Sequence, residues 1–340
     1  MWRLKILAPN IRLVLLLTPC PYRTGHEIDY AKSLGIETIL KPKETIKALF
    51  FKKFSQKKGA ILALGGDPWY ARLWGIRYKI PAYLYTEDPN VSSLLFKHVF
   101  YKKKDGDLMA HYVQMAKERK VDLNQKEYCL WLCGSRPQHA DPILKLFIEA
   151  ILIIQKKRPQ FKPVLPCSPF LNDTVKQKLK KIQNPSITVV PHQAIYLMPE
   201  AKLMVSLPGT NTAEAAYMGL PTLMVLPLNK PELLIFHGVL GMISQLPILG
   251  RFFKKILIHH LRKHPPLLAL PNKMEKKEII PEVVKKISPE ELAIQVLSLY
   301  ENDEKLQTIK NDLHLFAKHF KKETSLPDDI IRTILSEKNL

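Results

Sequence analysis

Short apolar runs recur along the chain, separated by longer stretches that mix apolar and charged residues. Apolar runs bounded by Gly, Pro or charged residues are typical of strands buried on both faces. The runs that fit are 13–17, 60–64, 82–85, 128–133, 187–190, 203–207 and 222–226. Amphipathic segments at 27–34, 142–156 and 212–218 predict helices between them. The alternation of strand and helix predicts an α/β protein with mainly parallel sheets.

The length of the chain predicts more than one domain. It has 340 residues, and single hydrophobic cores stop growing at about 250–300 residues. The polar segment 121–127 precedes a strong apolar run, after which the strand–loop–helix pattern begins again. We therefore predict one domain over residues 1–122 and a second over 123–318. The tail from Pro289 onward predicts two or three helices, the first capped by Ser288.

The charge balance narrows the class of partner. Lys and Arg number 52 against 31 Asp and Glu, a net charge of +21, which attracts nucleic acid, an anionic membrane or phosphorylated substrates. The four cysteines have no zinc-site spacing, and no metal site is evident among the histidines, so we expect buried thiols in a reducing compartment. Since the run at 13–17 is too short to span a bilayer, we predict a soluble or peripheral protein.

Gly134, Ser135 and Arg136 form the first candidate binding motif. They come directly after the predicted strand 128–133 and before the predicted helix. A Gly-Ser turn at a strand end lets backbone N–H groups approach an anion, and an arginine adds a bidentate phosphate contact. An ordinary surface turn would have the same sequence, so this motif alone leaves both interpretations open.

The second candidate motif follows the predicted strand 203–207 and opens a helix. Gly209 permits a tight turn, and Thr210 and Thr212 offer hydroxyl groups near the start of the helix. Glu214 could accept hydrogen bonds from a ribose diol, as acidic residues do in other nucleotide-binding α/β domains. The alternative is a capping box that Glu214 completes.

The order of these motifs resembles the nucleotide-binding half of the lipid-A-disaccharide synthase family. The resemblance combines the Gly134–Arg136 loop, the segment PGTNTAEAAYMGLPTLMV, and Pro271-Asn272 followed by Glu278-Ile279-Ile280-Pro281-Glu282, over residues 128–300. Together these motifs are specific, although each singly is not.

The resemblance implies a GT-B fold, in which two Rossmann-like domains with parallel sheets face each other across a cleft. Residues 319–340 would cross back to pack on the N-terminal domain. It also implies an inverting transfer from a UDP-acylglucosamine donor to a lipid-linked acylglucosamine phosphate acceptor, with no bound metal or other cofactor. The donor contacts that it implies are Gly134, Ser135, Arg136, Gln193, Gly209, Thr210, Glu214 and Asn272.

The N-terminal half matches the family less closely. Asp67 follows the predicted strand 60–64, where the family carries a strand-end aspartate, and a carboxylate there could act as general base on the acceptor hydroxyl. The sequence Gly-Gly-Asp-Pro equally fits a turn before a helix. Glu87 and Asp88 are a second acidic pair. The family's early glycine-rich segment is missing, and Pro208 replaces the serine expected before Gly-Thr.

Three stretches combine aromatic and basic residues, and they predict contact with an anionic membrane. They are 49–54, 94–104 and 250–263. In the third, a helix would place apolar side chains on one face beside basic ones, as interfacial helices do. The membrane-contact residues predicted there are Phe252, Phe253, Lys254, Ile256, Leu257 and Leu261. A helix packed on its own domain is the alternative.

These features predict a cytoplasmic enzyme, peripheral on the inner face of the cell membrane. Three alternatives remain open: a membrane glycosyltransferase of the peptidoglycan N-acetylglucosaminyltransferase type, a UDP-N-acetylglucosamine epimerase, and a non-catalytic relative that binds lipid or polyanions. Nucleic-acid binding is disfavoured, because the bases cluster with apolar residues and no recognition module is evident. The sequence does not indicate an oligomeric state.

Overall fold

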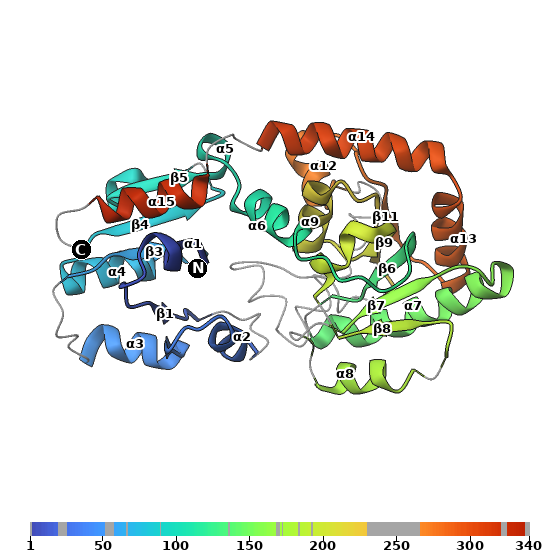
Figure 1. Ribbon diagram of the computed structural model, residues 1–340, viewed down its shortest axis with the longest axis horizontal. Helices are drawn as coiled ribbons and strands as arrows, with labels where there is room; N and C mark the ends of the chain where they lie inside the picture. The colour runs from blue at the N-terminus through green and yellow to red at the C-terminus, as the bar shows by residue number, and fades with distance from the viewer. Residues whose placement is uncertain are drawn as a thin grey trace. The chain divides into compact units, whose positions relative to one another are not determined.

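The computed structural model describes most of the chain (Figure 1). The described residues are 2–19, 26–51, 58–65, 67–88, 90–134, 137–167, 171, 173–182, 184–191, 193–229, 266–320 and 325–336. They divide into two compact units, one of residues 1–111 with 319–340 and the other of residues 112–318. The dividing point lies within helix α6 (Leu108–Lys117), before the boundary at 122 that the sequence suggested.

The larger unit is built on one six-stranded parallel sheet. Its strands are β6 (Tyr128–Leu132), β7 (Pro163–Pro166), β8 (Thr188–Val190), β9 (Ala201–Ser206), β10 (Thr222–Pro227) and β11 (Glu282–Lys285). The order across the sheet is β11-β10-β9-β6-β7-β8, with every neighbouring pair parallel. Numbered from β6, the order read from β8 is 3-2-1-4-5-6, the doubly wound arrangement of dinucleotide-binding domains.

Helices connect and cover these strands (Figure 1). They are α7 (Pro137–Lys157), α8 (Asp173–Lys180), α9 (Thr210–Met218), α12 (Leu270–Glu275), α13 (Pro289–Tyr300) and α14 (Asp303–Phe320), with short 3-10 turns η2 (Ala194–Tyr196) and η3 (Met198–Glu200). Every residue of β6 is buried, and Trp131 packs edge-to-face on Phe147 of α7 with ring centroids 5.1 Å apart. Ser288 is the N-cap of α13, as its sequence predicted, and it also forms a capping box with Glu291.

The smaller unit contains two short parallel sheets. One pairs β1 (Val14–Leu16) with β2 (Thr38–Leu40), and the other has the order β3 (Ile61–Ala63), β4 (Ala82–Thr86), β5 (His98–Tyr101). The helices are α1 (Trp2–Leu7), α2 (Glu27–Ser33), α3 (Pro42–Phe51), α4 (Pro68–Tyr78), α5 (Lys102–Asp105) and α15 (Leu326–Leu335), with the 3-10 turn η1 (Ser93–Leu95).

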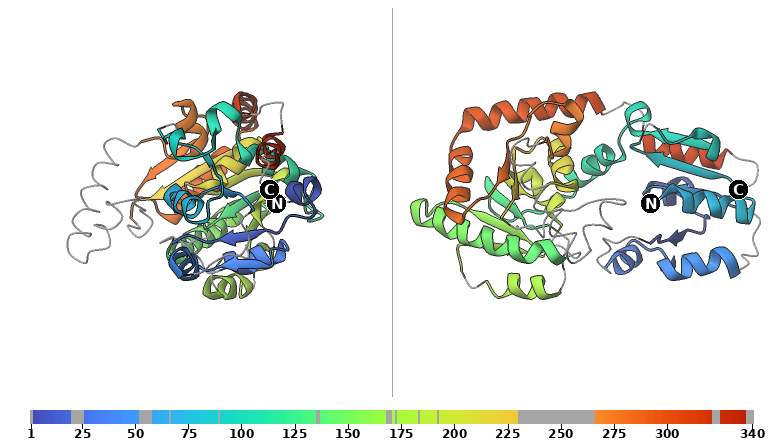
Figure 2. Two further views of the ribbon diagram at one scale, coloured as in Figure 1. Left: turned by 90° about the vertical axis from the view of Figure 1, so that its left-hand side faces the viewer. Right: turned by 180° about the vertical axis from the view of Figure 1, so that it is seen from behind.

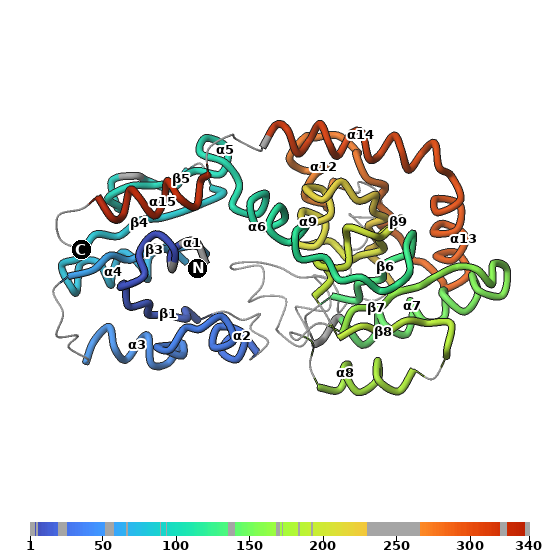
Figure 3. Tube along the Cα trace, viewed as in Figure 1, coloured from blue at the N-terminus to red at the C-terminus, as the bar shows by residue number. Residues whose placement is uncertain are grey.

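The last helix of the chain belongs to the unit that the first residues form. Leu326 and Ile330 of α15 share a buried cluster with Tyr83 of β4 and Phe100 of β5, and α15 also contacts α1. The tube in Figure 3, and the views in Figure 2, show the red α15 beside the cyan β4 and β5. Helix α15 therefore contributes to the hydrophobic core of the smaller unit.

All seven predicted strands are present, but the described residues form four further strands that were missed. These are β2, β5, β7 and β11. β7 has the sequence PVLP, in which proline at both ends argues against a strand. β11 reads EVVK, too short and polar to be distinguished from a loop. Their pairing partners, rather than their own sequences, decide their structure.

Candidate functional site

The loops that follow β6 and β9 lie side by side in the larger unit. These strands are neighbours, with Leu132 in register with Ser206 at their carboxyl ends. The chain order of the sheet reverses between them, because β7 and β8 lie to one side of β6 and β10 and β11 lie beyond β9. In open α/β sheets, ligands bind outside the carboxyl ends of strands at such a switch point. The sheet therefore brings the two predicted loops together there.

Gly134 begins the first loop in a conformation that suits glycine. Its φ is +85°, in the left-handed region, and an added Cβ would lie 3.3 Å from Leu207 Cδ1 of the second loop. Ser135 and Arg136 lie outside the described residues, so their predicted phosphate contacts stay predictions.

Helix α7 begins at Pro137, directly after the first loop, and not near Pro142 as predicted. Proline favours the first position of a helix, which made Pro142 a reasonable start, but Pro137 takes that position and Pro142 lies inside the helix. The N-terminus of α7 consequently lies within three residues of Gly134.

The second loop leads into a helix whose N-cap has no side chain. Gly209 is the N-cap of α9, and the exposed Thr210 is its first residue. Thr212 is buried, and its Oγ1 donates to the Gly209 carbonyl (2.7 Å) and accepts from the Leu270 N–H of α12 (3.3 Å). The N-terminus of a helix attracts anions through its N–H groups and dipole. The loop is thus arranged to receive a negatively charged group.

Glu214 does not complete a capping box, which corrects one of its two predicted roles. It is the fifth residue of α9, whereas a capping box needs an acid at the third position and a side chain at the N-cap. Its side chain is half-buried, and no hydrogen bond or ion pair joins its carboxylate to another described residue. Burial raises the pKa of Glu214 to about 7. A carboxylate held this way would gain from a ligand that donates hydrogen bonds to it.

Asn272 is fully buried, so the structure does not place it as a contact for a ligand. Its Nδ2 donates to the Ile280 carbonyl (2.8 Å) and to Glu282 Oε1 (2.7 Å), and its Oδ1 accepts from the N–H groups of Ile279 (2.8 Å) and Ile280 (3.0 Å). An amide side chain has two donors and two acceptor lone pairs, and all four are used. The predicted cleft residue is instead a framework residue.

Glu282 connects Asn272 to the backbone at the start of α12. Its carboxylate accepts from the N–H groups of Leu268 (2.8 Å) and Ala269 (2.9 Å), at the start of α12. The Pro-Asn and Ile-Ile-Pro-Glu elements of the family pattern therefore close one hydrogen-bonded loop that holds α12 against Thr212 of α9. Sequence reasoning placed Glu282 in a motif but did not assign this role, which only the contacts reveal.

Gln193 lies on the same side of the larger unit as α9. It is the N-cap of η2, which packs on α9, and its Oε1 accepts from the Tyr112 hydroxyl (3.3 Å). The side chain is half-buried. Neither feature assigns it a ligand, and its predicted donor contact stays a prediction.

Asp67 of the smaller unit is exposed at the carboxyl end of β3. It caps α4, with the Trp69 N–H donating to its Oδ1 (3.0 Å), as the turn interpretation predicted. This bond uses one carboxylate oxygen, so a role as general base remains compatible with capping. Of the second acidic pair, Glu87 is bonded to Lys102, and Asp88 Oδ1 accepts from the Asn90 N–H (2.9 Å).

An ionic cluster at the ends of β4 and β5, in which Lys102 and Asp107 are buried and Glu87 is exposed, was not predicted. Lys102 is only 6% exposed, and its Nζ lies 2.8 Å from Glu87 Oε1 and 3.0 Å from Asp107 Oδ2, itself 3% exposed. Asp107 also accepts from Tyr85 Oη and from the Met109 N–H at the start of α6. In the sequence, Lys102 is one of three consecutive lysines in the stretch 94–104, which was predicted to contact a membrane. The cluster ties the sheet to the first turn of α6.

The predicted membrane stretches have different outcomes. Phe252, Phe253, Lys254, Ile256, Leu257 and Leu261 lie outside the described residues. In the stretch 94–104, which contains β5, Phe96 and Phe100 lie in the core and Lys102 is buried in the ionic cluster, so these three side chains do not form a membrane surface. In the stretch 49–54, Phe50 and Phe51 end α3 with exposed rings.

The described residues contain neither a membrane-spanning helix nor a cluster of metal ligands. No helix among them is long and apolar enough to cross a bilayer, and no three of their His, Cys, Asp or Glu side chains gather as metal ligands would. Cys129 and Cys133 are buried thiols, Cys167 is half-buried, and Cys20 is not described.

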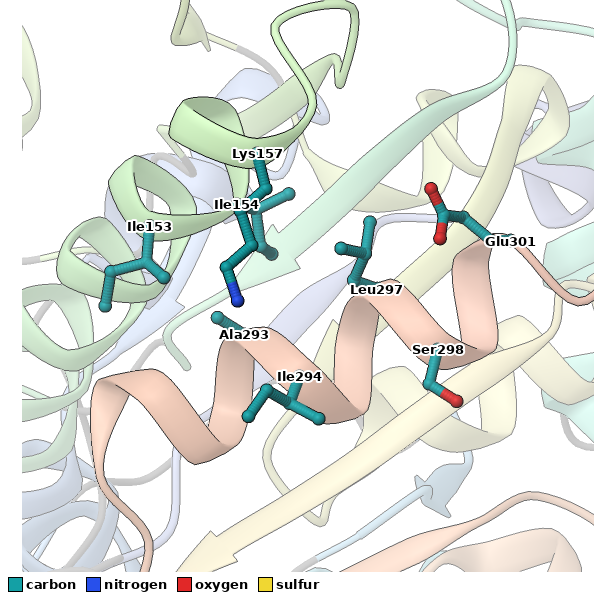
Figure 4. A pocket seen from close by; sticks show the side chains of 8 residues that line it. All are labelled: Ile153, Ile154, Lys157, Ala293, Ile294, Leu297, Ser298 and Glu301. Carbon is teal, nitrogen blue, oxygen red and sulfur yellow. The ribbon is translucent and has the colours of Figure 1, made fainter.

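One cavity of about 290 Å³ lies away from the switch point, between α7 and α13 (Figure 4). It is lined mainly by apolar side chains, among them Ile154 and Leu297. Because α7 and α13 run back from the carboxyl ends of the strands, these late turns lie toward the opposite edge of the sheet. The cavity is therefore separate from the two loops.

Residues 106–239 match the family model of lipid-A-disaccharide synthetase. That range contains both loops of the switch point and Glu214. The resemblance predicted from the motifs is therefore confirmed for this part of the chain.

Two curated relatives extend the match over about half the chain. The lipid-A-disaccharide synthase of Nitrosococcus oceani is 25% identical over 184 residues, which are 54% of this chain and 42% of that protein. That of Persephonella marina is 28% identical over 192 residues, 55% of this chain and 45% of that protein. The chain thus spans less than half the length of the lipid-A-disaccharide synthases it matches.

Solved structures show the fold over nearly the whole chain. A UDP-GlcNAc 2-epimerase from Neisseria meningitidis, bound to UDP-GlcNAc, aligns with a TM-score of 0.54 and 14% identity over 92% of this chain and 90% of its own. A second UDP-N-acetylglucosamine 2-epimerase aligns with a TM-score of 0.51 and 10% identity over 99% of this chain and 92% of its own. The predicted fold class, a double Rossmann-like α/β protein of the GT-B type, is confirmed.

Proposed function

We propose that this protein is a glycosyltransferase that binds a UDP-sugar at the switch point of its larger unit and transfers the sugar to a lipid-linked acceptor. One observation carries the proposal: residues that match the lipid-A-disaccharide synthetase family form two adjacent loops at the switch point of a doubly wound sheet. This is the place where nucleotides bind in such sheets. The donor proposed from the family resemblance is UDP-acylglucosamine, and the acceptor is an acylated glucosamine phosphate.

Each part of the site has a stated role in the proposal. The diphosphate would lie against the Gly134–Arg136 loop and the N-terminus of α9 at Gly209 and Thr210, where backbone N–H groups and Arg136 compensate its charge. The ribose hydroxyls would donate to Glu214. Asn272 and Glu282 would act indirectly, by holding α12 against the start of α9.

The proposed reaction is a direct displacement at the anomeric carbon. The acceptor hydroxyl oxygen forms the new glycosidic bond as the bond to the UDP oxygen breaks, so the configuration inverts and UDP leaves with the bonding electrons. Asp67 would accept the hydroxyl proton, since a positioned carboxylate can serve as general base. No metal has a part in this scheme, because the helix N-terminus and Arg136 would stabilise the departing diphosphate.

Calorimetric titration with UDP-N-acetylglucosamine tests the donor site without needing the lipid acceptor. We expect Glu214→Gln to weaken binding about tenfold, because the substitution removes the negative charge and replaces one of the two acceptor oxygens by a donor NH2 group. The affinity of the unmodified protein should rise from pH 6 to pH 8 as Glu214 ionises, and Glu214→Gln should lose this dependence.

Glu304→Gln, which changes an exposed carboxylate of α14, is the matched control and should bind as the parent does. Absence of binding in the unmodified protein would refute the proposal. Binding without transfer to any glucosamine-phosphate lipid would refute the transfer step and leave a donor-binding relative.

A further inference from the structure

Two cysteines lie at the ends of neighbouring strands in the larger unit. Cys133 follows the last residue of β6, and Cys167 follows the last residue of β7. The two strands are parallel, with Leu130 in register with Val164. The same register, carried on to the strand ends, places Cys133 opposite Cys167. Both thiols are free in the structure.

The two thiols lie on the same face of the sheet. Successive side chains of a strand alternate between faces, so Cys133 shares the face of Trp131, which packs on α7. Burial raises the pKa of Cys167, and Lys176 and Lys180 of α8 oppose this shift, so this thiol lies beside α8. Helices α7 and α8 contact each other, and they therefore cover one face.

The spacing of neighbouring strands is close to that of a disulfide bond. Neighbouring strands lie about 4.8 Å apart, and a disulfide joins Cβ atoms about 3.8 Å apart. Burial raises the pKa of Cys133 to about 12, and the nearby Cys167 adds to this shift. A bond between the two sulfur atoms would therefore require the strand ends to approach by about 1 Å.

Such a movement would act on the first donor-site loop, because Cys133 is directly joined to Gly134. The Cys133 thiol donates a weak hydrogen bond to the Gly134 carbonyl oxygen (3.8 Å), and a disulfide sulfur has no hydrogen to donate. Gly134 in turn packs closely on the second loop, where an added Cβ would lie 3.3 Å from Leu207 Cδ1. A shift of Cys133 would thus reach both loops of the switch point.

We propose that Cys133 and Cys167 are a site of reversible oxidation, at which hydrogen peroxide joins them in a disulfide that lowers the affinity of the donor site. This inference rests on the proposed function for its consequence, since that proposal assigns the adjoining loop to the donor diphosphate. Disulfides that form in a reducing compartment are usually transient and serve catalysis or redox sensing.

The oxidation takes place in two steps. Cys167 is half-buried and meets the peroxide before the buried Cys133 does. Its thiolate sulfur bonds to one peroxide oxygen as the O–O bond breaks, which gives a sulfenic acid and a hydroxide that takes up the thiol proton. The Cys133 sulfur then bonds to the sulfenic sulfur as the S–O bond breaks, and the oxygen leaves as water with the Cys133 proton. Two thiols are oxidised to one disulfide, and one peroxide is reduced to two water molecules.

Peptide mapping of the full-length protein tests the site without any nucleotide. After treatment with hydrogen peroxide and blocking of the remaining thiols with N-ethylmaleimide, mass spectrometry should identify peptides joined through Cys133 and Cys167. Dithiothreitol should separate them. Cys129→Ala, which removes a buried thiol of the same strand, is the matched control and should still form the bond. Oxidation of Cys167 without this bond, or a bond through Cys20 instead, would overturn the inference.

Calorimetric titration with UDP-N-acetylglucosamine measures the consequence for the donor site. We expect the oxidised parent to bind about tenfold more weakly than the reduced parent, with the affinity restored by dithiothreitol. Cys167→Ser should bind the donor equally before and after peroxide treatment. Cys133→Ala is a second variant that cannot form the bond, and peroxide should not change its affinity either.

Hydrogen exchange around Gly134 and Gly209 provides a measurement that needs no donor. Exchange there should change on oxidation of the parent and stay the same in Cys167→Ser. A disulfide that alters neither the affinity nor the exchange would overturn the regulatory role. A reduced parent that binds no donor would refute the proposed function, and the peptide map and the exchange would then decide this inference by themselves.

Discussion

At the scale of single residues, the structure separates side chains that offer free atoms from those that hold the fold. Glu214 and Asn272 belong to the same family pattern, and both were predicted to contact the donor. Asn272 is fully buried with all its hydrogen-bonding capacity used, whereas the half-buried Glu214 carboxylate has no described partner. The sequence shows which polar group a residue carries. Whether that group can bind a ligand depends on whether neighbouring backbone groups already use its hydrogen-bonding atoms.

The raised pKa of Glu214 predicts how stability changes with pH. Because the folded state holds this proton up to about pH 7 while the unfolded chain releases it near 4.5, the folded protein binds more protons between these values. The free energy of unfolding should therefore fall as pH rises from about 4.5 to 7, by at most about 3 kcal/mol from this group.

Urea denaturation at pH 5 and pH 8 measures this contribution. Glu214→Gln should lose less stability between the two pH values than the parent, and Glu304→Gln should behave as the parent does. If Glu214→Gln and the parent differ by the same free energy of unfolding at both pH values, ionisation of the buried Glu214 does not cause the loss of stability between pH 5 and pH 8.

At the scale of elements, the end of α9 is fixed by a glycine that the sequence showed only as part of a motif. Gly219 terminates α9 in the left-handed conformation, with φ +76°. An added Cβ would lie 2.9 Å from Nε2 and 3.2 Å from Cδ2 of His314 on α14. The left-handed conformation favours glycine at the end of the helix. The close approach of α14 is a second reason for glycine, because a side chain at this position would clash with His314.

Gly219→Ala is expected to lower the free energy of unfolding by about 1–3 kcal/mol, because the left-handed conformation disfavours alanine and His314 must move. Gly65→Ala is the control, since nothing lies within 4 Å of its added Cβ and its φ is not positive. Thermal denaturation of both variants provides the comparison. Equal melting temperatures for the two variants would show that His314 and α14 can move without lowering the free energy of unfolding.

At the scale of the whole molecule, the C-terminal helix α15 completes the hydrophobic core of the smaller unit. Helix α15 covers Tyr83 and Phe100, which belong to strands more than 200 residues earlier in the chain. The family resemblance implied that residues 319–340 cross back to the N-terminal domain, and they belong to the same compact unit as residues 1–111. No periodicity in the tail itself indicates which sheet it covers.

Ile330→Asn should therefore destabilise the smaller unit selectively. Placing an amide among apolar side chains leaves its polar atoms unsatisfied and costs about 2–4 kcal/mol. Hydrogen exchange should show lower protection in β4 and β5, with β6 and β9 unchanged. Arg332→Asn, on the exposed side of α15, is the control. Equal loss of protection in both units would show that they unfold together.

The sequence by itself determined the fold class, the seven strands with continuous apolar runs, and the two loops that were candidates for binding. Each depends on local signals: runs of apolar residues, and glycine with hydroxyl residues at strand ends. Only the tertiary structure decided that the loops after β6 and β9 are neighbours, that β2, β5, β7 and β11 are strands, and that Asn272 and Lys102 are buried. The reason is physical, since strand pairing and burial arise from contacts between segments far apart in the chain.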